Sequence, residues 1–287
     1  MNFRLSLSGE LPKPSVAALF TGVGLLRSEF VLRRHGASLQ QLYVQEALTQ
    51  YVAAVCERFA GKPVWYRFAD LWADEAATLT NDKTYSVEQN PMLGIRGLRR
   101  ARVDQEAFRL ELEILGALGE RFDNLHIIFP FIQDHAEFDY FASLLRKMQW
   151  PNRYGAMLEV PSALLEVEQL ISSGASNLVF GLNDLSCLTL GQDRGTDAIK
   201  LHPALWRLIN LAIADISGRC EYGVAGKLSS KILEKVEQET VDYISLHYGQ
   251  LPELMNNPAF LEMEDVNLVT QIKRQTNLAK LSLKRET

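Results

Sequence analysis

The sequence predicts a single α/β domain, residues 1–287, folded as a (β/α)8 barrel of the TIM type. Eight short apolar runs, rich in β-branched and aromatic residues, alternate with segments of helical periodicity. A barrel of this type needs about 250 residues plus insertions, which fits the chain length. No Pro-rich or Gly-rich linker divides the chain. A doubly wound open sheet is the alternative, but such sheets usually contain fewer strands.

The predicted strands read FRLSLS from Phe3, GVGLLRSE from Gly22, VWYRFAD from Val64, HIIFPFI from His126, YGAMLEV from Tyr154, NLVFGLN from Asn177, CEYGVAG from Cys220 and DYISLH from Asp242. The segment from Gln105 to Leu118 repeats apolar residues at three- and four-residue steps, which predicts a helix. Asp134, followed by Glu137, predicts a helix start directly after the fourth strand.

Composition excludes several classes of protein. The net charge is −5 and there is no basic run, so a nucleic-acid interface is not expected, and an anionic ligand would need local arginines. The three cysteines, Cys56, Cys187 and Cys220, are widely spaced and indicate a reducing compartment without a disulfide or zinc framework. The sequence contains no signal peptide and no membrane-spanning run, so we expect a soluble cytoplasmic protein.

Functional groups of a (β/α)8 barrel gather at the carboxyl ends of its strands. This rule selects Arg27 and Glu29, Arg67 and Asp70, Glu159, Asn183 and Asp184, and the segment 223–227. Glu159 and Asp184 follow neighbouring strands, and two carboxylates at that spacing suit Mg²⁺ or Mn²⁺. Arg27 and Arg67, with Arg96 behind them, would present guanidinium groups to a carboxylate or phosphate.

Each of these residues also has a purely structural interpretation. Glu159 precedes a Val-Pro pair that is typical of a strand end before a helix. The two strand-end arginines can pair with neighbouring acids at the surface, and Asn183 with Asp184 can cap the next helix. The coincidence of five polar positions at one rim favours a functional site over these separate explanations.

Six motifs occur in the order found in one known family. They are GVGLLRSEF from Gly22, RFADLWADEA from Arg67, NPMLGIRGLRR from Asn90, IIFPFI from Ile127, GAMLEVPSALL from Gly155 and FGLNDLSCLTLGQDR from Phe180. Together they resemble the phosphoenolpyruvate-binding barrel of phosphoenolpyruvate synthase, pyruvate phosphate dikinase and the sugar phosphotransferase Enzyme I. The resemblance places the chain in the phosphoenolpyruvate/pyruvate barrel superfamily.

The resemblance also implies roles for individual residues. Glu159 and Asp184 would hold Mg²⁺, while Arg27, Arg67 and Arg96 would hold the phosphate and carboxylate of phosphoenolpyruvate or pyruvate. Asn183 would contact the substrate beside Asp184, so that Arg27, Arg67 and Asn183 serve in catalysis. In this scheme the cation stabilises a pyruvate enolate, and the arginines neutralise a phosphoryl group exchanged with a phosphohistidine.

The chain departs from the family pattern at two points. The seventh strand ends in GVAG, with Ala225 where the relatives place a proton-donating Cys. Cys220 is expected at the opposite end of the barrel, and nothing selects Tyr222, Lys227 or Ser229 as a substitute acid.

The second departure concerns phosphohistidine. Of the five histidines, His126 and His247 lie in predicted strands, and His35, His135 and His202 lie in loops or helix starts. None has the sequence context of the family's phosphohistidine, so each is interpreted as structural or solvated. Trp72 and Cys187 also differ from the usual Lys and Gln and indicate an altered pocket.

Three hypotheses follow. The preferred one is a stand-alone phosphoenolpyruvate synthase-like phosphotransferase domain, working with a separate phosphohistidine-domain protein. The second is a metal-dependent aldolase or lyase that acts on a pyruvate enolate and needs neither phosphohistidine nor Cys. The third is a binding or regulatory protein without turnover. The resemblance further implies a homodimer.

Overall fold

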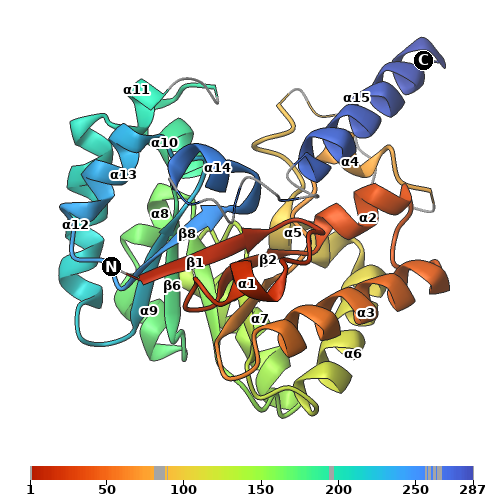
Figure 1. Cartoon of the computed structure of the whole chain (residues 1–287), viewed down its shortest axis with the longest axis horizontal. Coiled ribbons are helices and arrows are strands. Elements are labelled where there is room, and N and C mark those ends of the chain that lie inside the picture. The colour runs from red at the N-terminus through yellow and green to blue at the C-terminus, as the bar shows by residue number, and fades with distance from the viewer. Residues whose placement is uncertain are drawn as a thin grey trace.

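The structure is a computed structural model that describes residues 2–80, 88, 90–193, 197–255, 257, 260, 263 and 267–286, without the side chains of 284–286. In this part of the chain eight parallel strands pair in sequence order and close into a barrel, β1 with β8 included. Helices follow the strands and surround the barrel (Figure 1). The predicted (β/α)8 barrel is therefore confirmed.

The strands are β1 (Asn2–Leu7), β2 (Val23–Arg27), β3 (Val64–Arg67), β4 (Leu125–Phe129), β5 (Tyr154–Leu158), β6 (Asn177–Gly181), β7 (Glu221–Ala225) and β8 (Tyr243–His247). Each coincides with one of the predicted runs. Seven of the eight strands end before the predicted run does. Asp70 thus lies beyond β3 and not within it.

The helices are α1 (Pro14–Ala17), α2 (Glu29–His35), α3 (Leu42–Arg58), α4 (Ala73–Ala76), α5 (Gly97–Val103), α6 (Gln105–Gly119), α7 (His135–Lys147), α8 (Pro161–Leu164), α9 (Val167–Ser172), α10 (Leu182–Leu190), α11 (Asp197–Lys200), α12 (Pro203–Ile216), α13 (Ser230–Glu237), η1 (Tyr248–Gln250), α14 (Leu251–Leu254) and α15 (Leu268–Glu286). The predicted helix from Gln105 corresponds to α6. No helix in the described ranges is long and apolar enough to cross a membrane.

One observed helix start agrees with the start predicted from the sequence, and another differs from it. Asp134 caps α7, since its Oδ1 accepts a hydrogen bond from Glu137 N at 2.7 Å. By contrast, α10 begins directly at the end of β6 with Gly181 at its N-cap, which places Asn183 and Asp184 in the first turn. The capping interpretation of that pair is therefore wrong. Another difference is His35, which ends α2 and does not start a helix.

Alternate strand residues face opposite sides of the barrel wall. On β7, Tyr222 and Val224 join the large apolar cluster between strands and helices. Ala225 belongs to a separate cluster that fills the barrel. The members of this inner cluster are Leu25, Trp65, Ile128, Met157, Val179, Ala225 and Tyr243. The barrel is thus filled by side chains, and ligands have access only at its ends.

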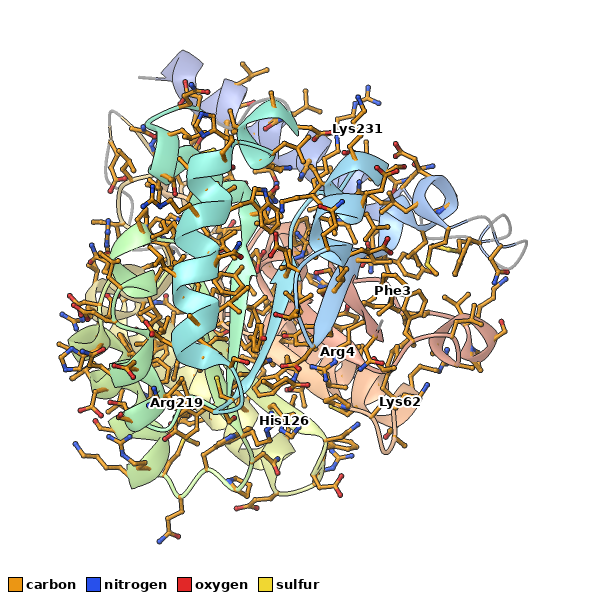
Figure 2. All side chains as sticks on the ribbon, turned by 90° about the vertical axis from the view of Figure 1, so that its left-hand side faces the viewer. Phe3, Arg4, Lys62, His126, Arg219 and Lys231 are labelled. Carbon is orange, nitrogen blue, oxygen red and sulfur yellow. The ribbon has the colours of Figure 1, made fainter. Side chains whose placement is uncertain are left out.

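The two ends of the barrel differ in chemistry. At the amino end, Arg4 pairs with Glu221, and the His126 ring lies 4.7 Å from that of Trp65. Burial lowers the pKa of His126 to about 4. Figure 2 shows Arg219, which precedes β7, at this end, and Lys231, at the start of the following helix, at the other. Cys220 therefore lies at the end opposite to Ala225, as the sequence predicts.

Candidate active site at the carboxyl ends of the strands

Three buried carboxylates meet at the carboxyl ends of the strands. Asp70 follows β3, Glu159 follows β5 and Asp184 lies in the first turn of α10 after β6. One oxygen from each lies within 4.8 Å of the others, and all three residues are at most 6% exposed. Mg²⁺ and Mn²⁺ prefer hard oxygen ligands such as these carboxylates, which come from separate elements and lie close together. The residues present therefore fit a divalent cation, although Asp70 was not among the predicted ligands.

Two buried arginines neutralise these carboxylates. Arg96 donates to both oxygens of Asp70, from Nε at 3.0 Å and Nη2 at 2.6 Å, and to Asp184 Oδ2 at 3.0 Å. Arg67 donates to Glu29 and lies 3.5 Å from Asp70 Oδ2. Burial alone would lower the pKa of Arg96, but Asp70 and Asp184 outweigh it and raise that pKa. Both arginines are therefore charged, and each contacts acidic groups directly.

Phe131 connects the acidic and basic sides of this cluster. Its backbone N donates to Glu159 Oε2 at 3.0 Å, and its ring centroid lies 4.1 Å from the guanidinium carbon of Arg96. The residue has φ of 51°, a left-handed conformation that costs energy for a non-glycine residue. Gly97 allows Phe131 to pack closely against it, because a Cβ on Gly97 would lie 2.9 Å from the Phe131 Cβ. One strained backbone position thus lies directly beside the carboxylates.

The negative charge of the cluster affects the pKa of Glu159. Burial, followed by the nearby Asp184 and Asp70 charges, raises the pKa of Glu159 to about 7, although Arg67 and Arg96 act in the opposite direction. Gly181 allows the close packing of this side chain, since a Cβ at Gly181 would lie 2.5 Å from Glu159 Cγ. An added cation would therefore be favoured electrostatically at this position.

Arg27 lies at the same rim but outside the carboxylate cluster. Its Nη2 is 2.6 Å from Nε2 of His247, the last residue of β8, and it also donates to Ser8 Oγ. Burial lowers the pKa of Arg27 to about 10. Burial, then Arg27, Lys273 and Lys227, lower the pKa of His247 to about 2. The ring of His247 is therefore neutral.

Asn183 and Ala225 lie at the ends of β6 and β7. Asn183 Oδ1 accepts from Lys227 N at 3.2 Å, which ties the start of α10 to the segment after β7. Cys187 Sγ lies 3.0 Å from Asn183 O. Ala225 is 2% exposed and pairs with Gly181 and Ser245 on the neighbouring strands. A side chain at this position faces the inside of the barrel near its carboxyl end.

The structure brings most of the predicted site residues to one rim. Arg67, Arg96, Glu159 and Asp184 form the direct contacts described above. Sequence reasoning missed His247 as a neighbour of Arg27, although its place at the end of a predicted strand was a usable signal. The motif from Phe180 extends to Arg194, which lies outside the described residues.

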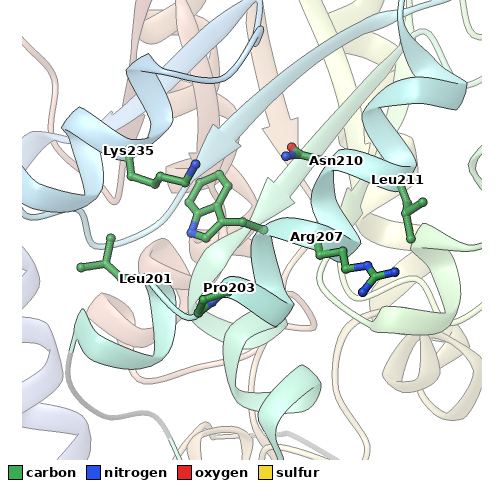
Figure 3. Close-up of a pocket in the computed structure, with 7 residues that line it drawn as sticks. Leu201, Pro203, Arg207, Asn210, Leu211 and Lys235 are labelled. Atoms are coloured by element: carbon green, nitrogen blue, oxygen red, sulfur yellow. The ribbon is translucent and has the colours of Figure 1, made fainter.

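A groove on the outer wall is a separate feature (Figure 3). It is lined by Leu201, Pro203, Trp206, Arg207, Asn210, Leu211 and Lys235, from α12, α13 and the segment before α12. Among these lining residues there is no carboxylate, and Lys235 Nζ lies 5.1 Å from the Trp206 ring centroid. The groove therefore carries the basic side chains Arg207 and Lys235 but none of the carboxylates found at the barrel rim.

Fold and rim together define the class of protein: a (β/α)8 barrel with a buried cluster of carboxylates and arginines at the carboxyl ends of its strands. Residues 12–254 match the family described as PEP-utilising enzyme, PEP-binding domain, where PEP is phosphoenolpyruvate. The chain belongs to this family, as the sequence motifs predict.

Relatives support this assignment over most of the chain. A probable phosphoenolpyruvate synthase of Methanocaldococcus jannaschii is 28% identical over 256 residues, which are 82% of this chain and 22% of that protein. A phosphoenolpyruvate-protein phosphotransferase of Streptomyces coelicolor is 31% identical over 204 residues, 69% of this chain and 35% of that protein. The chain thus spans between about a fifth and a third of the length of these relatives.

Solved structures share the fold. An aldolase/citrate lyase family protein from Burkholderia cenocepacia J2315 has a TM-score of 0.53 at 12% identity, covering 96% of this chain and 93% of that chain. The citrate synthase SbnG has a TM-score of 0.52 at 12% identity, covering 95% and 94% of the respective chains. Similarity at this level of identity establishes the shared fold alone.

Proposed function

We propose that the chain binds phosphoenolpyruvate or pyruvate at the barrel rim together with Mg²⁺ or Mn²⁺. The observation that carries this proposal is the cluster of Asp70, Glu159 and Asp184, buried against the guanidinium groups of Arg67 and Arg96. Carboxylates in this arrangement suit a hard cation, and arginines suit the anionic groups of a keto acid. Membership of the PEP-utilising family agrees with this ligand class.

Each residue of the site has its own role in the proposed binding of the cation and the ligand. Glu159 and Asp184, joined by Asp70, would hold the cation, which when bound supplies positive charge that stabilises an enolate. Arg67 and Arg96 would orient the carboxylate of the ligand, and each has a buried donor, Nε and Nη1 respectively, with no hydrogen-bond partner among the described residues. Asn183 would contact the ligand from the start of α10. Arg27 would hold a second anionic group.

As a phosphotransferase, the domain would exchange a phosphoryl group between phosphoenolpyruvate and a phosphohistidine presented by a separate domain or protein. The relatives named as a synthase and a phosphotransferase motivate this part of the proposal. A homodimer remains a prediction from the family resemblance.

The test is isothermal titration calorimetry of the purified chain with phosphoenolpyruvate, pyruvate and the enolate mimic oxalate, each with Mg²⁺ or with EDTA. Wild type is expected to bind oxalate only with Mg²⁺, and Asp184→Asn and Glu159→Gln to weaken this binding by about tenfold or more, the effect of one lost charge-assisted contact. Glu113→Gln, which removes a carboxylate that is 58% exposed on α6, is the matched control. Equal affinities in wild type and both site variants would refute the assignment.

A second candidate is a carbon–carbon lyase or aldolase acting on the same enolate. Ala225, at the inner end of β7, favours it, because the position where the family has a proton-donating thiol carries no acid. Incubation with pyruvate and a panel of aldehydes, followed by NMR detection of hydroxy-keto acids, separates the two activities. The phosphotransferase instead predicts phosphoryl exchange that depends on a phosphohistidine protein.

A further inference from the structure

Three buried side chains at the amino end of the barrel carry polar atoms that have no hydrogen-bond partner among the described residues. These atoms are Nε and Nη1 of Arg4, Nε1 of Trp65 and Nδ1 of His126. Each of the three residues is at most 8% exposed. A buried donor without an acceptor destabilises a fold, so such groups in a native protein are usually satisfied by a bound water or ion.

The three side chains are connected through their neighbours. Trp65 on β3 and His126 on β4 are register partners, and their ring centroids lie 4.7 Å apart. Arg4 on β1 and Arg153, which precedes β5, both pair with Glu221. The guanidinium carbon of Arg153 in turn lies 5.0 Å from the Trp65 ring centroid. Figure 2 shows Arg4 and His126 toward the same end of the barrel, so the unpartnered atoms surround one region of its interior.

The ring of Tyr243 separates this region from the rim at the other end. The guanidinium carbon of Arg4 lies 3.9 Å from the centroid of this ring. A Cβ at Gly223 would lie 2.5 Å from Tyr243 Cζ, and a Cβ at Gly24 would lie 3.1 Å from Tyr243 Cε2. The ring therefore crosses the barrel between β2 and β7. The unpartnered atoms are accordingly reached from the amino end and not from the acidic cluster.

The charges of this region favour an anion. Glu221 is the one carboxylate shared by the guanidinium groups of Arg4 and Arg153, so positive charge is in excess. Asp123, the other acid that acts on His126, is exposed. Burial and then Arg153 lower the pKa of His126 to about 4, so the ring is neutral at pH 7 and its single proton can lie on Nδ1.

The unpartnered atoms also match an anion in their hydrogen-bonding capacity. Arginine Nε and Nη1 and the indole Nε1 can only donate. A water molecule placed among them would bring protons that need acceptors of their own. A small anion accepts from all of these donors and balances the excess charge.

We propose that Arg4, Trp65 and His126 form a binding site for a small monovalent inorganic anion of the size of chloride. The bound anion would link β1, β3 and β4 at the amino end of the barrel. This site is separate from the rim and does not depend on the ligand proposed there. Because the donors come together only in the folded chain, the anion stabilises the native state, and stability rises with its concentration.

The test is urea unfolding while potassium chloride replaces potassium gluconate, a bulky organic anion, at constant ionic strength. The unfolding midpoint of wild type is expected to rise with chloride. Trp65→Phe keeps an aromatic ring but removes the Nε1 donor, and it is expected to weaken chloride binding about tenfold, as for one hydrogen bond to a charged group. Trp206→Phe is the matched control, since it removes an indole donor that bonds Lys200 O at 2.8 Å on the outer wall. It is expected to keep the chloride dependence of wild type.

Anomalous diffraction from wild-type crystals soaked in bromide locates the site directly and does not depend on the folding of a variant. A peak within hydrogen-bond distance of Arg4 Nη1 and Trp65 Nε1 is expected. Absence of this peak would overturn the inference and leave water as the partner of these donors. A chloride dependence that is missing in wild type, or unchanged in Trp65→Phe, would also overturn it. A bromide peak would in that case represent binding at crystal concentration only.

Discussion

Glu111 is a buried carboxylate that joins α6 to the ends of β2 and β3. Its Oε1 accepts hydrogen bonds from Ser28 Oγ at 3.1 Å, Tyr66 Oη at 2.6 Å and Ala69 N at 3.1 Å. Ser28 and Ala69 lie one residue from Arg27 and Asp70, respectively, so this contact supports the rim from behind. We predict that Glu111→Gln stabilises the fold at alkaline pH.

The magnitude follows from the pKa of this group. Burial raises the pKa of Glu111 from 4.5 to about 7, although the three hydrogen bonds oppose the shift. Because the pKa of Glu111 is higher in the folded than in the unfolded protein, its protonated form stabilises the fold. This stabilisation is fully present below the unfolded pKa of 4.5 and is lost as pH rises through about 7. At pH 8 the ionised carboxylate therefore costs about 3 kcal/mol. Glutamine keeps an acceptor oxygen at the same place and carries no charge.

The assay is urea unfolding of wild type and Glu111→Gln at pH 5 and pH 8. The variant is expected to gain up to about 3 kcal/mol at pH 8, or roughly 5 °C in melting temperature, and little at pH 5. Glu113→Gln, on the exposed side of the same helix, is expected to leave both values unchanged. A variant that is less stable at pH 8, or that keeps the pH dependence of wild type, would show that Glu111 is not the buried charge responsible.

Three further predictions concern the rim. Gly181→Ala places a Cβ 2.5 Å from Glu159 Cγ, so Mg²⁺-dependent oxalate affinity is expected to fall about tenfold by calorimetry while the circular dichroism spectrum is retained. Ala225→Cys restores a thiol at the inner end of β7, and faster exchange of pyruvate methyl protons with deuterium is expected by ¹H NMR; an unchanged rate would locate the deficit elsewhere. Arg96→Met leaves Asp70 and Asp184 without their shared counter-ion, and denaturant unfolding is expected to show a loss of about 3 to 5 kcal/mol. A loss below 1 kcal/mol would contradict a buried ion pair.

The barrel could be predicted from sequence because each strand is a separate apolar run. Strands buried on both faces read as continuous apolar stretches, and the helices between them keep their own period. The predicted ends of the strands are less accurate than their positions. Phe68 and Ala69 extend the apolar run of β3 as far as Asp70, yet the strand itself ends at Arg67, and Asp70 lies in the connection that follows, with its carboxylate at the rim.

The strand-end rule predicts site residues only where they follow strands, and Arg96 is named from its motif instead. Glu159 and Asp184 follow strands, and the rule selects them. Arg96 comes from the N-cap of α5, so its contacts with Asp70 and Asp184 depend on a long connection whose course no local pattern specifies. His126 and His247 both lie in strands, but His126 is the second residue of β4 and His247 is the last residue of β8. That difference places them at opposite ends of the barrel.

The way Arg96 is shared has a consequence for ligand binding as a whole. One guanidinium holds Asp70 and Asp184, both members of the acidic cluster, and it is also a donor suited to the anionic ligand. A divalent ion that takes over Asp184 would release Arg96 Nη2 for the proposed ligand, beside Nη1, which has no hydrogen-bond partner among the described residues, and a ligand that engages Nη2 would free Asp184 for the ion. The two affinities are then heterotropically linked, and each must rise by the same factor when the other partner is present.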